Sequence, residues 1–564
     1  MMDSSDLRQK FLDFFKSKGH VIIPSSSLVP ENDPSVLLTT AGMQQFKPYY
    51  TSAADPLKDN HLSLGKPLGS KSVATVQKSF RTSDIDEVGD NTHLTFFEML
   101  GNFSFGGYGK KEAIEYAYEF ITGTLGLTID YVSVFAGEGN VPTDLESENI
   151  WKSIDGKLKI VRSGRADNFW GPTGDQGPCG PTTEIYVNGV EIWNIVFNEF
   201  YQNADKSLTK LDRLGIDTGM GLERLAAVVQ NVPTVFDTDL LKFLIDEQAE
   251  MIPEESKRII ADHARAIVFL ISDGVVPSNK EAGYILRRIL RRFIVKRRNS
   301  TGDIFTPIVN VINYYKKFYE LDDKKIVNVF KEEYERFEKT LNIGIRELEK
   351  IEVINAANAF DLFQSYGLPY EVIKDISGDK SAHLKRADFD KEFAKHQDVS
   401  RVASAGMFKG GLVDHESQTI KHHTAHHLLL AALRQVLGNH VLQRGSNVSS
   451  DRLRIDFSHP AKMTDEEKNK VEQIVNEAIR QDLDVKREEM PKAEAEKLGA
   501  LAEFGTKYGD VVSVYSILNK DGTVFSREFC GGPHVTHTGE LGSFKILKEE
   551  AVAAGIRRIK AKAE

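Results

Sequence analysis

An acidic and a basic side chain lie close together in a stretch interrupted by glycines, LGIDTGMGLERLAAVV at residues 214–229. Asp217 follows an apolar lead-in and can hold a cation such as an amine, whereas the planar fork of donors on Arg224 suits phosphate. Gly219 and Gly221 have no Cβ, so the backbone there can turn tightly or lie flat against a ligand. The stretch predicts a site for a molecule that carries both charges. The alternative is a strand–turn–helix in which the glycines serve packing and Arg224 is solvated, because glycine motifs also match by chance.

Three histidines and one cysteine form a second group of side chains that could do chemistry. His423 and His427 are four residues apart in a predicted helix, so both face the same side. Cys530 and His534 are also four residues apart, in the segment FCGGPHV. Three imidazoles and a thiolate make a tetrahedral ligand set for zinc. Histidines with a purely structural role are the alternative, because either pair alone is common.

A basic run, YILRRILRRFIVKRR at residues 284–298, is the third candidate. Its apolar residues form one helical stripe, so the same helix can present a dense positive face. Few acids lie nearby in the sequence, and the run therefore predicts contact with a phosphate backbone; a solvated face is the alternative. The arginines concerned are Arg287, Arg288, Arg291, Arg292, Arg297 and Arg298.

Composition limits the class of protein. The chain has 564 residues, a net charge of −10 and a hydrophobic share of 41%, which is ordinary for a soluble globular protein of three or four domains. Overall charge does not attract nucleic acid, so any such site must be a local basic patch. Only two cysteines are present, the N-terminus has no signal character, and no apolar run has the length of a membrane span. We therefore expect a cytoplasmic protein that does not cross a membrane.

The sequence pattern around these residues predicts an α+β fold in several domains. Residues 1–236 predict an antiparallel sheet with helices, including a helix capped by Ser4 or Ser5, strands at 36–40, 73–81, 92–100 and 191–201, and a glycine-rich loop at 167–183. Residues 237–376 predict an all-helical domain. A polar connector is expected at 377–410, followed by a second α+β region at 411–564.

Several of these stretches resemble one known family. SFRTSDIDEVGDNTHLTFFEMLGNFSFGGYG at residues 79–109 is similar to the second signature of the class II aminoacyl-tRNA synthetases, in the form found in the alanyl-tRNA synthetases. LLTTAGMQQFKPYY resembles the first signature and LGIDTGMGLERLAAVV the third. DNFWGPTGDQGPCGPTTEIY and EIWNIVFNEF resemble segments that line the amino-acid pocket. The resemblance implies a class II catalytic domain, a helical tRNA-binding domain and a zinc-containing editing domain, in that order.

The resemblance also implies an activity: ATP-dependent formation of alanyl-adenylate, followed by transfer of alanine to tRNA(Ala). Arg81 would bind the α-phosphate of ATP, Arg224 the γ-phosphate, and Mg²⁺ would bridge the phosphates. Asp217 would pair with the ammonium group of alanine. The remaining implied contacts are Phe97, Glu98 and Met99 around adenine, and Met43, Trp170, Asn194 and Gly219 around alanine.

The family's other sites fall on the helical and C-terminal regions. Asn279 would read a G·U pair of the tRNA acceptor stem, with Arg287, Arg288, Arg291 and Arg292 on the backbone. His423, His427, Cys530 and His534 match the zinc ligands of an editing domain that hydrolyses seryl- and glycyl-tRNA, and Gln443 matches a position in its pocket. A second site of this kind is needed because binding alone discriminates weakly between amino acids that differ by one small group.

Three departures from the family pattern bear on these expectations. Only Thr82 and Ser83 separate Arg81 from the DIDEVG segment, where the family has a longer turn. Thr182 stands where a second cysteine often follows Cys179, so no metal is expected there. Gln364 replaces an aspartate that commonly assists in reading the G·U pair.

The sequence also lacks segments that the family usually has before HTAHHLL and after IRRIKA, which predicts a compact form without the C-terminal dimerisation domain. We expect a monomer, or a chain paired with a separate C-terminal polypeptide. The alternative functions are a stand-alone hydrolase of mischarged tRNA and a non-catalytic tRNA-binding paralogue.

Overall fold

A broad, mostly antiparallel sheet forms the framework of the first part of the chain. Its strands follow the order β1-β2-β3-β9-β8-β7-β4-β5, and β6 pairs with β7 beside this path. Only the pairs β1–β2 and β4–β5 are parallel. The strands are β1 (Val21–Ile22), β2 (Ser72–Phe80), β3 (Phe96–Phe105), β4 (Tyr131–Phe135), β5 (Ile160–Ser163), β6 (Phe169–Trp170), β7 (Gly177–Val187), β8 (Val190–Gln202) and β9 (Leu208–Gly221).

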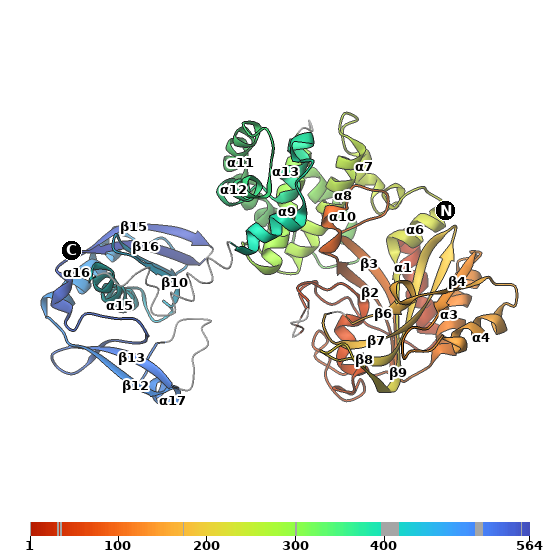
Figure 1. Ribbon diagram of the computed structural model, residues 1–564, viewed down its shortest axis with the longest axis horizontal. Coiled ribbons are helices and arrows are strands. Elements are labelled where there is room, and N and C mark those ends of the chain that lie inside the picture. Colours follow the sequence, from red (N-terminus) through yellow and green to blue (C-terminus); the bar gives the residue numbers. More distant parts are fainter. Residues whose placement is uncertain are drawn as a thin grey trace. The chain divides into compact units, whose positions relative to one another are not determined.

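The computed structural model describes residues 2–564 except 31–32, 34–35, 173, 299–301, 396–416, 502–510 and 554. The chain divides into two compact units, Met1–Phe389 and Asp390–Glu564, which are shown in Figure 1.

Helices α1 (Ser4–Ser17) and α6 (Leu222–Gln230) lie against the same side of the sheet of the first unit. The carboxylate of Asp3, rather than Ser4 or Ser5, caps α1 by accepting the backbone N–H of Asp6 at 2.8 Å. Phe11 and Phe15 of α1 are fully buried against Trp193 of β8. Shorter helices complete this part: α2 (Lys47–Tyr50), α3 (Lys110–Tyr118), α4 (Leu145–Ile154) and α5 (Arg165–Asn168).

A bundle of helices completes the first unit, as the sequence predicts. Its central helix, α8 (Glu254–Ser272), has apolar side chains on most of its circumference and is buried along most of its length. Phe269 of α8 stacks on Phe96 of β3 with ring centroids 4.2 Å apart, which joins the bundle to the sheet. The other helices are α7 (Lys242–Asp246), α9 (Glu281–Arg297), α10 (Thr306–Tyr315), α11 (Asp323–Glu349), α12 (Ala356–Tyr366), α13 (Tyr370–Ser377) and a helix over residues 386–395.

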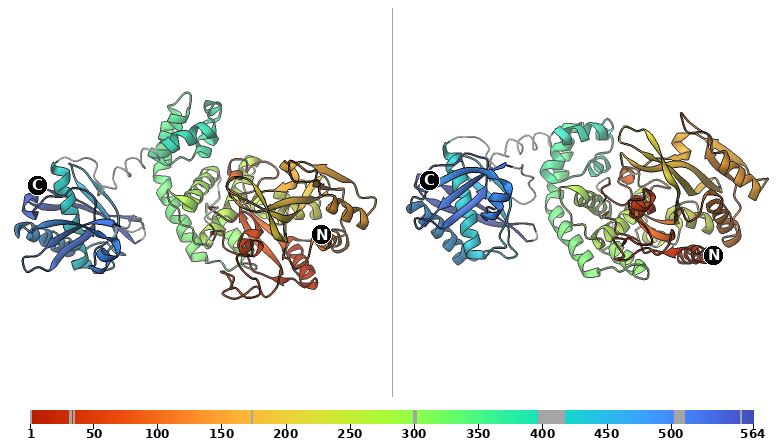
Figure 2. Two further views of the ribbon diagram at one scale, coloured as in Figure 1. Left: turned by 60° about the horizontal axis from the view of Figure 1, so that its bottom comes forward. Right: turned by 90° about the horizontal axis from the view of Figure 1, so that it is seen from below.

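The second unit is also α+β. One sheet has the order β10-β11-β16-β15 and the other β12-β13-β14. Helices α15 (Ser417–Leu437) and α16 (Asp465–Arg480) pack on the first sheet and bury an apolar core between them and the strands (Figure 2). The remaining elements are β10 (Gln443–Val448), β11 (Leu453–Ser458), β12 (Val485–Pro491), β13 (Val511–Leu518), β14 (Val524–Phe529), β15 (Phe544–Ala553), β16 (Ile556–Ala563) and α17 (Lys492–Lys497).

The structure corrects three expectations about local elements. Residues 36–40 form no strand and lead instead into a short 3-10 helix, Gly42–Phe46. The stretch 167–183, expected to be a loop because of its glycines, contains β6 and the first part of β7. Gly180 is needed in this strand because a Cβ there would lie 1.8 Å from the carbonyl oxygen of Phe197. The expected connector includes the helix 386–395, in which Phe389 is fully buried; residues 396–410 lie outside the described ranges.

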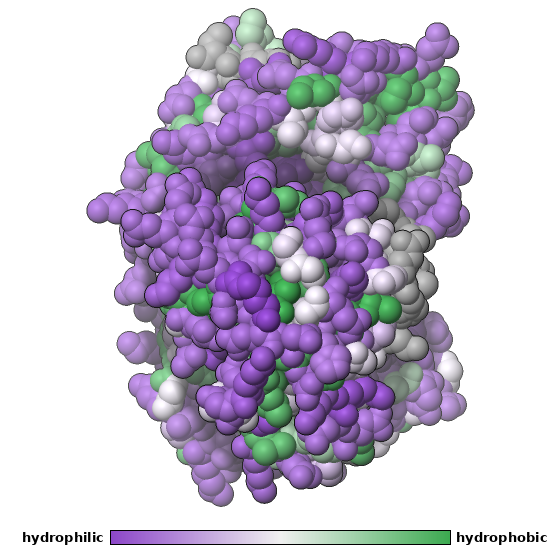
Figure 3. Space-filling model, turned by 90° about the vertical axis from the view of Figure 1, so that its left-hand side faces the viewer, coloured by the Kyte–Doolittle hydropathy of each residue, from purple (hydrophilic) through white to green (hydrophobic). Residues whose placement is uncertain are grey.

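No helix among the described residues is long and apolar enough to span a membrane. Hydrophilic side chains cover most of the face drawn in Figure 3, and its hydrophobic residues lie in small separate groups.

Candidate active site and metal centre

A pocket of about 320 Å³ opens on the sheet of the first unit. Most of the residues expected to bind ATP and alanine line it, although they come from segments far apart in the sequence. They are Arg81, Phe97, Met99, Trp170, Asn194, Asp217, Gly219 and Arg224. The structure thus brings together the side chains that the sequence motifs single out.

Asp217 is one of three buried acids that line this pocket, together with Glu184 and Glu223. It lies on β9 between Phe103 of β3 and Val196 of β8 and is only 6% exposed. Burial raises the pKa of its carboxyl group to about 7, because the charged form loses its hydration. No cationic side chain of the described residues pairs with it. The carboxylate is therefore placed to receive a cation from a ligand.

The glycines of β9 keep this surface open. Gly219 and Gly221 follow Asp217 at intervals of two residues, so all three face the pocket. A Cβ on Gly219 would lie 3.1 Å from the sulfur of Met99, whereas one on Gly221 would meet no atom within 4 Å. The first glycine allows Met99 to pack closely, and the second leaves free space.

Two arginines face the pocket from different elements. Arg224 is on the first turn of α6 and its Nη1 lies 3.1 Å from Oε2 of Glu191. The guanidinium carbon of Arg81, which follows β2, lies 4.9 Å from the ring centroid of Phe97. Burial first, and then the like charge of Arg224, lower the pKa of Arg81, which places the two cations near one another. Such a pair suits a polyanion.

Two expected ligand contacts do not line the pocket. Glu98 alternates with Phe97 and Met99 along β3, so its side chain lies on the opposite face. There it is fully buried, pairs with Arg8 of α1 and accepts a hydrogen bond from the hydroxyl of Tyr319 at 2.7 Å. The expectation that its carboxylate lies near adenine is therefore wrong. Met43 is fully buried in an apolar cluster against which Trp170 packs, so it supports the wall instead of lining it.

The pocket also contains polar residues that the sequence motifs did not single out. Glu184 and Glu191 come from β7 and β8, and Asp84 and His93 come from the loop between β2 and β3. Glu184 is the cross-strand partner of Asn194 and accepts its side-chain N–H at 3.3 Å. Strand pairing could have identified Glu184 only if the register of β7 and β8 had been known.

The raised pKa of Asp217 predicts a pH dependence. Only the ionised carboxylate can pair with an ammonium group, and it forms as the pH rises through about 7. The KM for an amino-acid substrate should therefore increase by up to tenfold per pH unit below 7 and level off above it. Steady-state kinetics between pH 5.5 and 8.5 measure this, and a flat profile would contradict the assignment.

The arginine-rich helix differs from its expected role. On α9 the side chains of Arg288, Arg292 and Arg297 are buried and pair with Glu371, Asp375 and Glu247 respectively. Arg287 and Arg291 both pair with Glu333 of α11. The expected positive face is therefore largely neutralised inside the bundle, and direct backbone contact by Arg288 and Arg292 is not compatible with their burial.

Asn279 remains on the surface, in the loop between α8 and α9, where its side-chain oxygen accepts a hydrogen bond from Nη1 of Arg287. Gln364 is exposed on α12. Of the expected acceptor-stem residues, Asn279 is thus the one placed to meet a large ligand.

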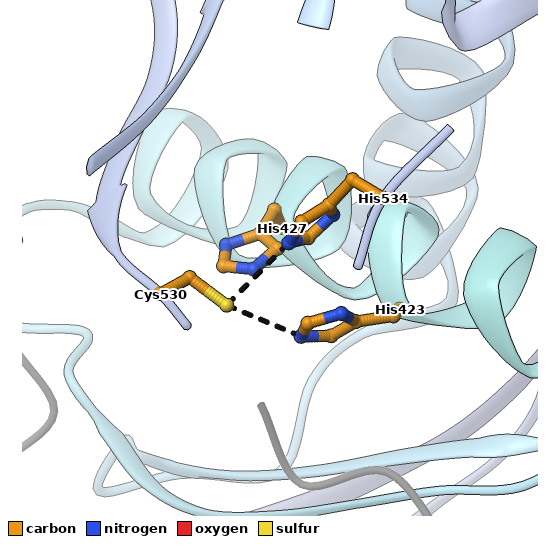
Figure 4. Close-up of side chains that lie close together, drawn as sticks. All are labelled: His423, His427, Cys530 and His534. Atoms are coloured by element: carbon orange, nitrogen blue, oxygen red, sulfur yellow. Dashed lines mark hydrogen bonds between the residues drawn. The ribbon is translucent and has the colours of Figure 1, made fainter. Parts of the chain in front are cut away.

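The four expected metal ligands meet in the second unit. His423 and His427 of α15, and Cys530 and His534 after β14, each offer a donor atom within 4.8 Å of the others (Figure 4). Nε2 of His423 and Nε2 of His534 both lie 3.4 Å from Sγ of Cys530. The cluster brings together two segments that are 103 residues apart in the sequence, which supports one shared function for the four side chains.

The outward-facing ring nitrogens of these histidines are also engaged. Nδ1 of His423 lies 2.9 Å from the carbonyl oxygen of Pro533, and Nδ1 of His427 lies 2.7 Å from a carboxylate oxygen of Glu528. The carbonyl acceptor makes Nδ1 of His423 the donor, which leaves Nε2 of that ring to bind a metal, and the carboxylate of Glu528 lies against the Nδ1 side of His427. Nδ1 of His534 lies 3.1 Å from the hydroxyl of Thr424. Outer partners of this kind orient the histidine ligands of metal sites, so the donor set fits zinc.

Gln443 begins β10 and is half-buried. Cys179, for which no metal is expected, is buried in an apolar cluster, and this burial raises the pKa of its thiol to about 11. It has no place in the four-residue cluster.

Comparison with known proteins finds similarity to one family along nearly the whole chain. Residues 6–444 match the family model of class II (A) tRNA synthetases, and residues 512–560 match that of the threonyl and alanyl tRNA synthetase second additional domain. The alanine–tRNA ligase of Treponema denticola is 44% identical, over 99% of this chain and 98% of its own length. That of Borrelia hermsii is 43% identical with 99% of each chain covered, and that of Pseudothermotoga lettingae is 36% identical over 99% of this chain and 80% of its own length.

Proposed function

The chain belongs to the alanine–tRNA ligases, and we propose that the pocket of the first unit is its alanine-activation site and that the second unit is a zinc-containing editing unit. The reaction of the family begins when the carboxylate of alanine attacks the α-phosphate of ATP, which forms alanyl-adenylate and releases pyrophosphate. Alanine is then transferred to the terminal ribose of its tRNA. Class II synthetases use ATP as a cosubstrate and require Mg²⁺.

The observation that carries the activation site is the meeting of the buried carboxylate of Asp217, with which no cation of the described residues pairs, and two arginines in one pocket. We assign Asp217 to the ammonium group of alanine, Arg81 to the α-phosphate and Arg224 to the γ-phosphate. Phosphoryl transfer needs positioning and charge neutralisation more than a general base, and fixed guanidinium groups provide both. In the absence of ligand, Arg224 pairs with Glu191.

The lining of the activation pocket also limits the size of the amino acid that can bind. Trp170, Asn194 and the packed Met99 line the pocket together with Asp217, and Gly219 allows Met99 to approach. A small pocket excludes larger side chains by overlap, yet it cannot exclude glycine and discriminates against serine by only one hydroxyl group. The activation site alone therefore leaves errors that need a second reaction.

We assign that reaction, hydrolysis of seryl- and glycyl-tRNA, to the second unit, with Gln443 as a residue of its pocket. His423, His427, Cys530 and His534 would hold zinc. Four protein ligands close the coordination shell, so the ion would supply a cross-link between α15 and the segment after β14 that shapes the site. The nearby carboxylate of Glu528 balances the positive charge of such a complex.

Pyrophosphate exchange with alanine, serine and glycine, measured with hydrolysis of seryl-tRNA(Ala) on the same sample, tests both assignments. We expect efficient exchange with alanine, weaker exchange with the other two, and rapid hydrolysis. Hydrolysis without exchange would favour a stand-alone hydrolase, and binding of tRNA without either reaction would favour a non-catalytic paralogue.

A further inference from the structure

The loop between β2 and β3, residues 81–95, forms one side of the activation pocket. Besides Arg81 it contributes Asp84, Thr92, His93 and Leu94 to the lining. Apart from a short 3-10 turn, Ser83–Asp86, it has no regular structure. Its three apolar side chains, Ile85, Val88 and Leu94, are buried, and the rest of the loop is held by polar contacts that help to determine where Arg81 stands relative to ATP.

The net negative charge of this loop is unfavourable for binding ATP. It carries four acids (Asp84, Asp86, Glu87 and Asp90) against Arg81 as its only permanent cation. The ligand beside it is the strongly anionic triphosphate of ATP. Carboxylates that no cation balances would repel the phosphates, and Asp84 is the acid of this loop that lines the pocket.

The helix α9 anchors this loop with two guanidinium groups, one of which pairs with Asp86. Nη2 of Arg288 lies 2.5 Å from Oδ1 of Asp86, and Nη1 of Arg292 donates a hydrogen bond of 2.5 Å to the carbonyl oxygen of Ile85. Both guanidinium groups are also held from behind, by Glu371 and Asp375 of α13. A buried, bidentate cation of this kind has little freedom, so it fixes the loop residues that it contacts.

The helix α8 holds the rest of the loop. Nη1 of Arg258 contacts the carbonyl oxygen of Asp90 at 3.1 Å and the side-chain oxygen of Asn91 at 2.7 Å. The carboxylate of Asp262 accepts the backbone N–H of Thr95 at 2.8 Å and its hydroxyl at 2.6 Å. The helical bundle therefore forms hydrogen bonds with the loop both at its turn and where the chain returns to β3.

We propose that Arg288 and Arg292 are positioning residues for alanine activation: they hold the β2–β3 loop so that Arg81 meets the phosphates of ATP. This proposal rests on the ligase activity of the family and assigns to the bundle a part in ATP binding that needs no tRNA. It also explains why these two arginines are buried in ion pairs instead of facing a solvent-exposed ligand.

Arg297 provides a matched control on the same helix. Like Arg288 it is buried, and it pairs with Glu247 at 2.6 Å, but among the described residues it forms no hydrogen bond or ion pair with 81–95. Substitution of any of these three arginines therefore removes a buried ion pair on α9. Only substitution of Arg288 or Arg292 also removes a contact to the loop.

The test measures pyrophosphate exchange without tRNA for Arg288→Met, Arg292→Met, Asp86→Asn and the control Arg297→Met, and it determines KM for ATP and for alanine separately. We expect the first two variants to raise the KM for ATP about tenfold or more, because each loses a charge-assisted contact to the loop. The KM for alanine should stay within about twofold, since Asp217, Asn194 and Trp170 lie on other strands.

Asp86→Asn removes the negative charge through which Arg288 pairs with the loop and leaves the pair of Arg288 with Glu371 intact, so it tests the ion pair even if Arg288→Met fails to fold. It should shift the KM for ATP in the same direction. Wild-type KM values for ATP in Asp86→Asn and Arg292→Met would overturn the proposal, as would equal shifts for ATP and alanine or an equal effect of Arg297→Met. Absence of exchange in the wild-type protein would instead contradict the activation site itself.

Discussion

Replacement of Asp217 by asparagine is expected to lower kcat/KM for alanine in pyrophosphate exchange about 100- to 1000-fold. The carboxylate is nearly inaccessible to solvent, and a buried cation that loses its partner costs about 3–5 kcal/mol, with about 1.4 kcal/mol for each factor of ten. The KM for ATP should change by no more than about twofold, because Arg81, Arg224 and Phe97 are unaltered. Exchange kinetics with each substrate varied in turn measure both effects.

The same substitution should not unfold the protein. The pKa of Asp217 is about 7 in the folded state and about 4 in an unfolded chain, so between these values only the unfolded state is ionised and stability falls as the pH rises. Above pH 7 the ionised carboxylate costs the free protein on the order of 3–4 kcal/mol at most. Asp217→Asn removes this cost, so thermal unfolding at pH 8 should occur at a higher temperature than in the wild type.

A suitable control is Asp212→Asn, the same change on the same strand at an exposed position. It should alter neither exchange nor thermal stability. Near-normal exchange in Asp217→Asn would contradict the role of the carboxylate, and so would a loss of alanine activation that merely follows a loss of folded protein.

The sequence motifs predicted the composition of the activation site better than its geometry. Phe97, Glu98 and Met99 stand together in one signature, and the prediction placed all three near adenine. Successive side chains of a strand face opposite sides, so β3 directs Glu98 to the ion pair with Arg8 while its neighbours line the pocket. The motif identified the strand, but the face of each residue depends on the register with β2 and β9, which the sequence does not state.

The arginines of α9 show a second limit. Within residues 284–298 there are no acids, and the run therefore indicated a free basic face. Their partners are Glu333, Glu371 and Asp375, which lie 42 to 83 residues later in the chain, and Asp86, which lies about 200 residues earlier. Only the packing of α9 against α11, α13 and the β2–β3 loop brings these charges together. The local density of charged residues in the sequence therefore predicts an exposed basic face poorly wherever a helix is buried on several sides.

The four-residue cluster could be predicted from the sequence because its residue types and spacing indicate a metal site even when the fold is not known. Two pairs with a spacing of four, made of residue types that share affinity for one metal, indicate a common site even without a known fold. The structure confirms that the four donors converge. The partners that orient them, Glu528, Pro533 and Thr424, could not be chosen in advance, because any carbonyl, hydroxyl or carboxylate near the rings would serve.

Replacement of Cys530 by alanine is expected to remove the zinc and to slow hydrolysis of seryl-tRNA(Ala) about 100-fold or more, while exchange with alanine remains at the wild-type rate. One of four ligands is lost, and the cross-link between α15 and the segment after β14 is lost with the metal. The wild type should contain about one zinc per chain, as four protein ligands complete one tetrahedral shell. Metal analysis, deacylation and exchange on one preparation measure all three quantities.

Cys179→Ala is the matched control, because it removes the other cysteine from a buried position in the first unit and should change neither zinc content nor deacylation. If Cys530→Ala folds poorly, Glu528→Gln keeps all four ligands and removes only the carboxylate behind His427; loss of such a partner weakens metal binding about 10- to 100-fold. Its zinc should then be removed by chelator concentrations that leave the wild type intact. Wild-type protein without zinc, or Cys530→Ala with both zinc and deacylation unchanged, would show that the four side chains are not metal ligands.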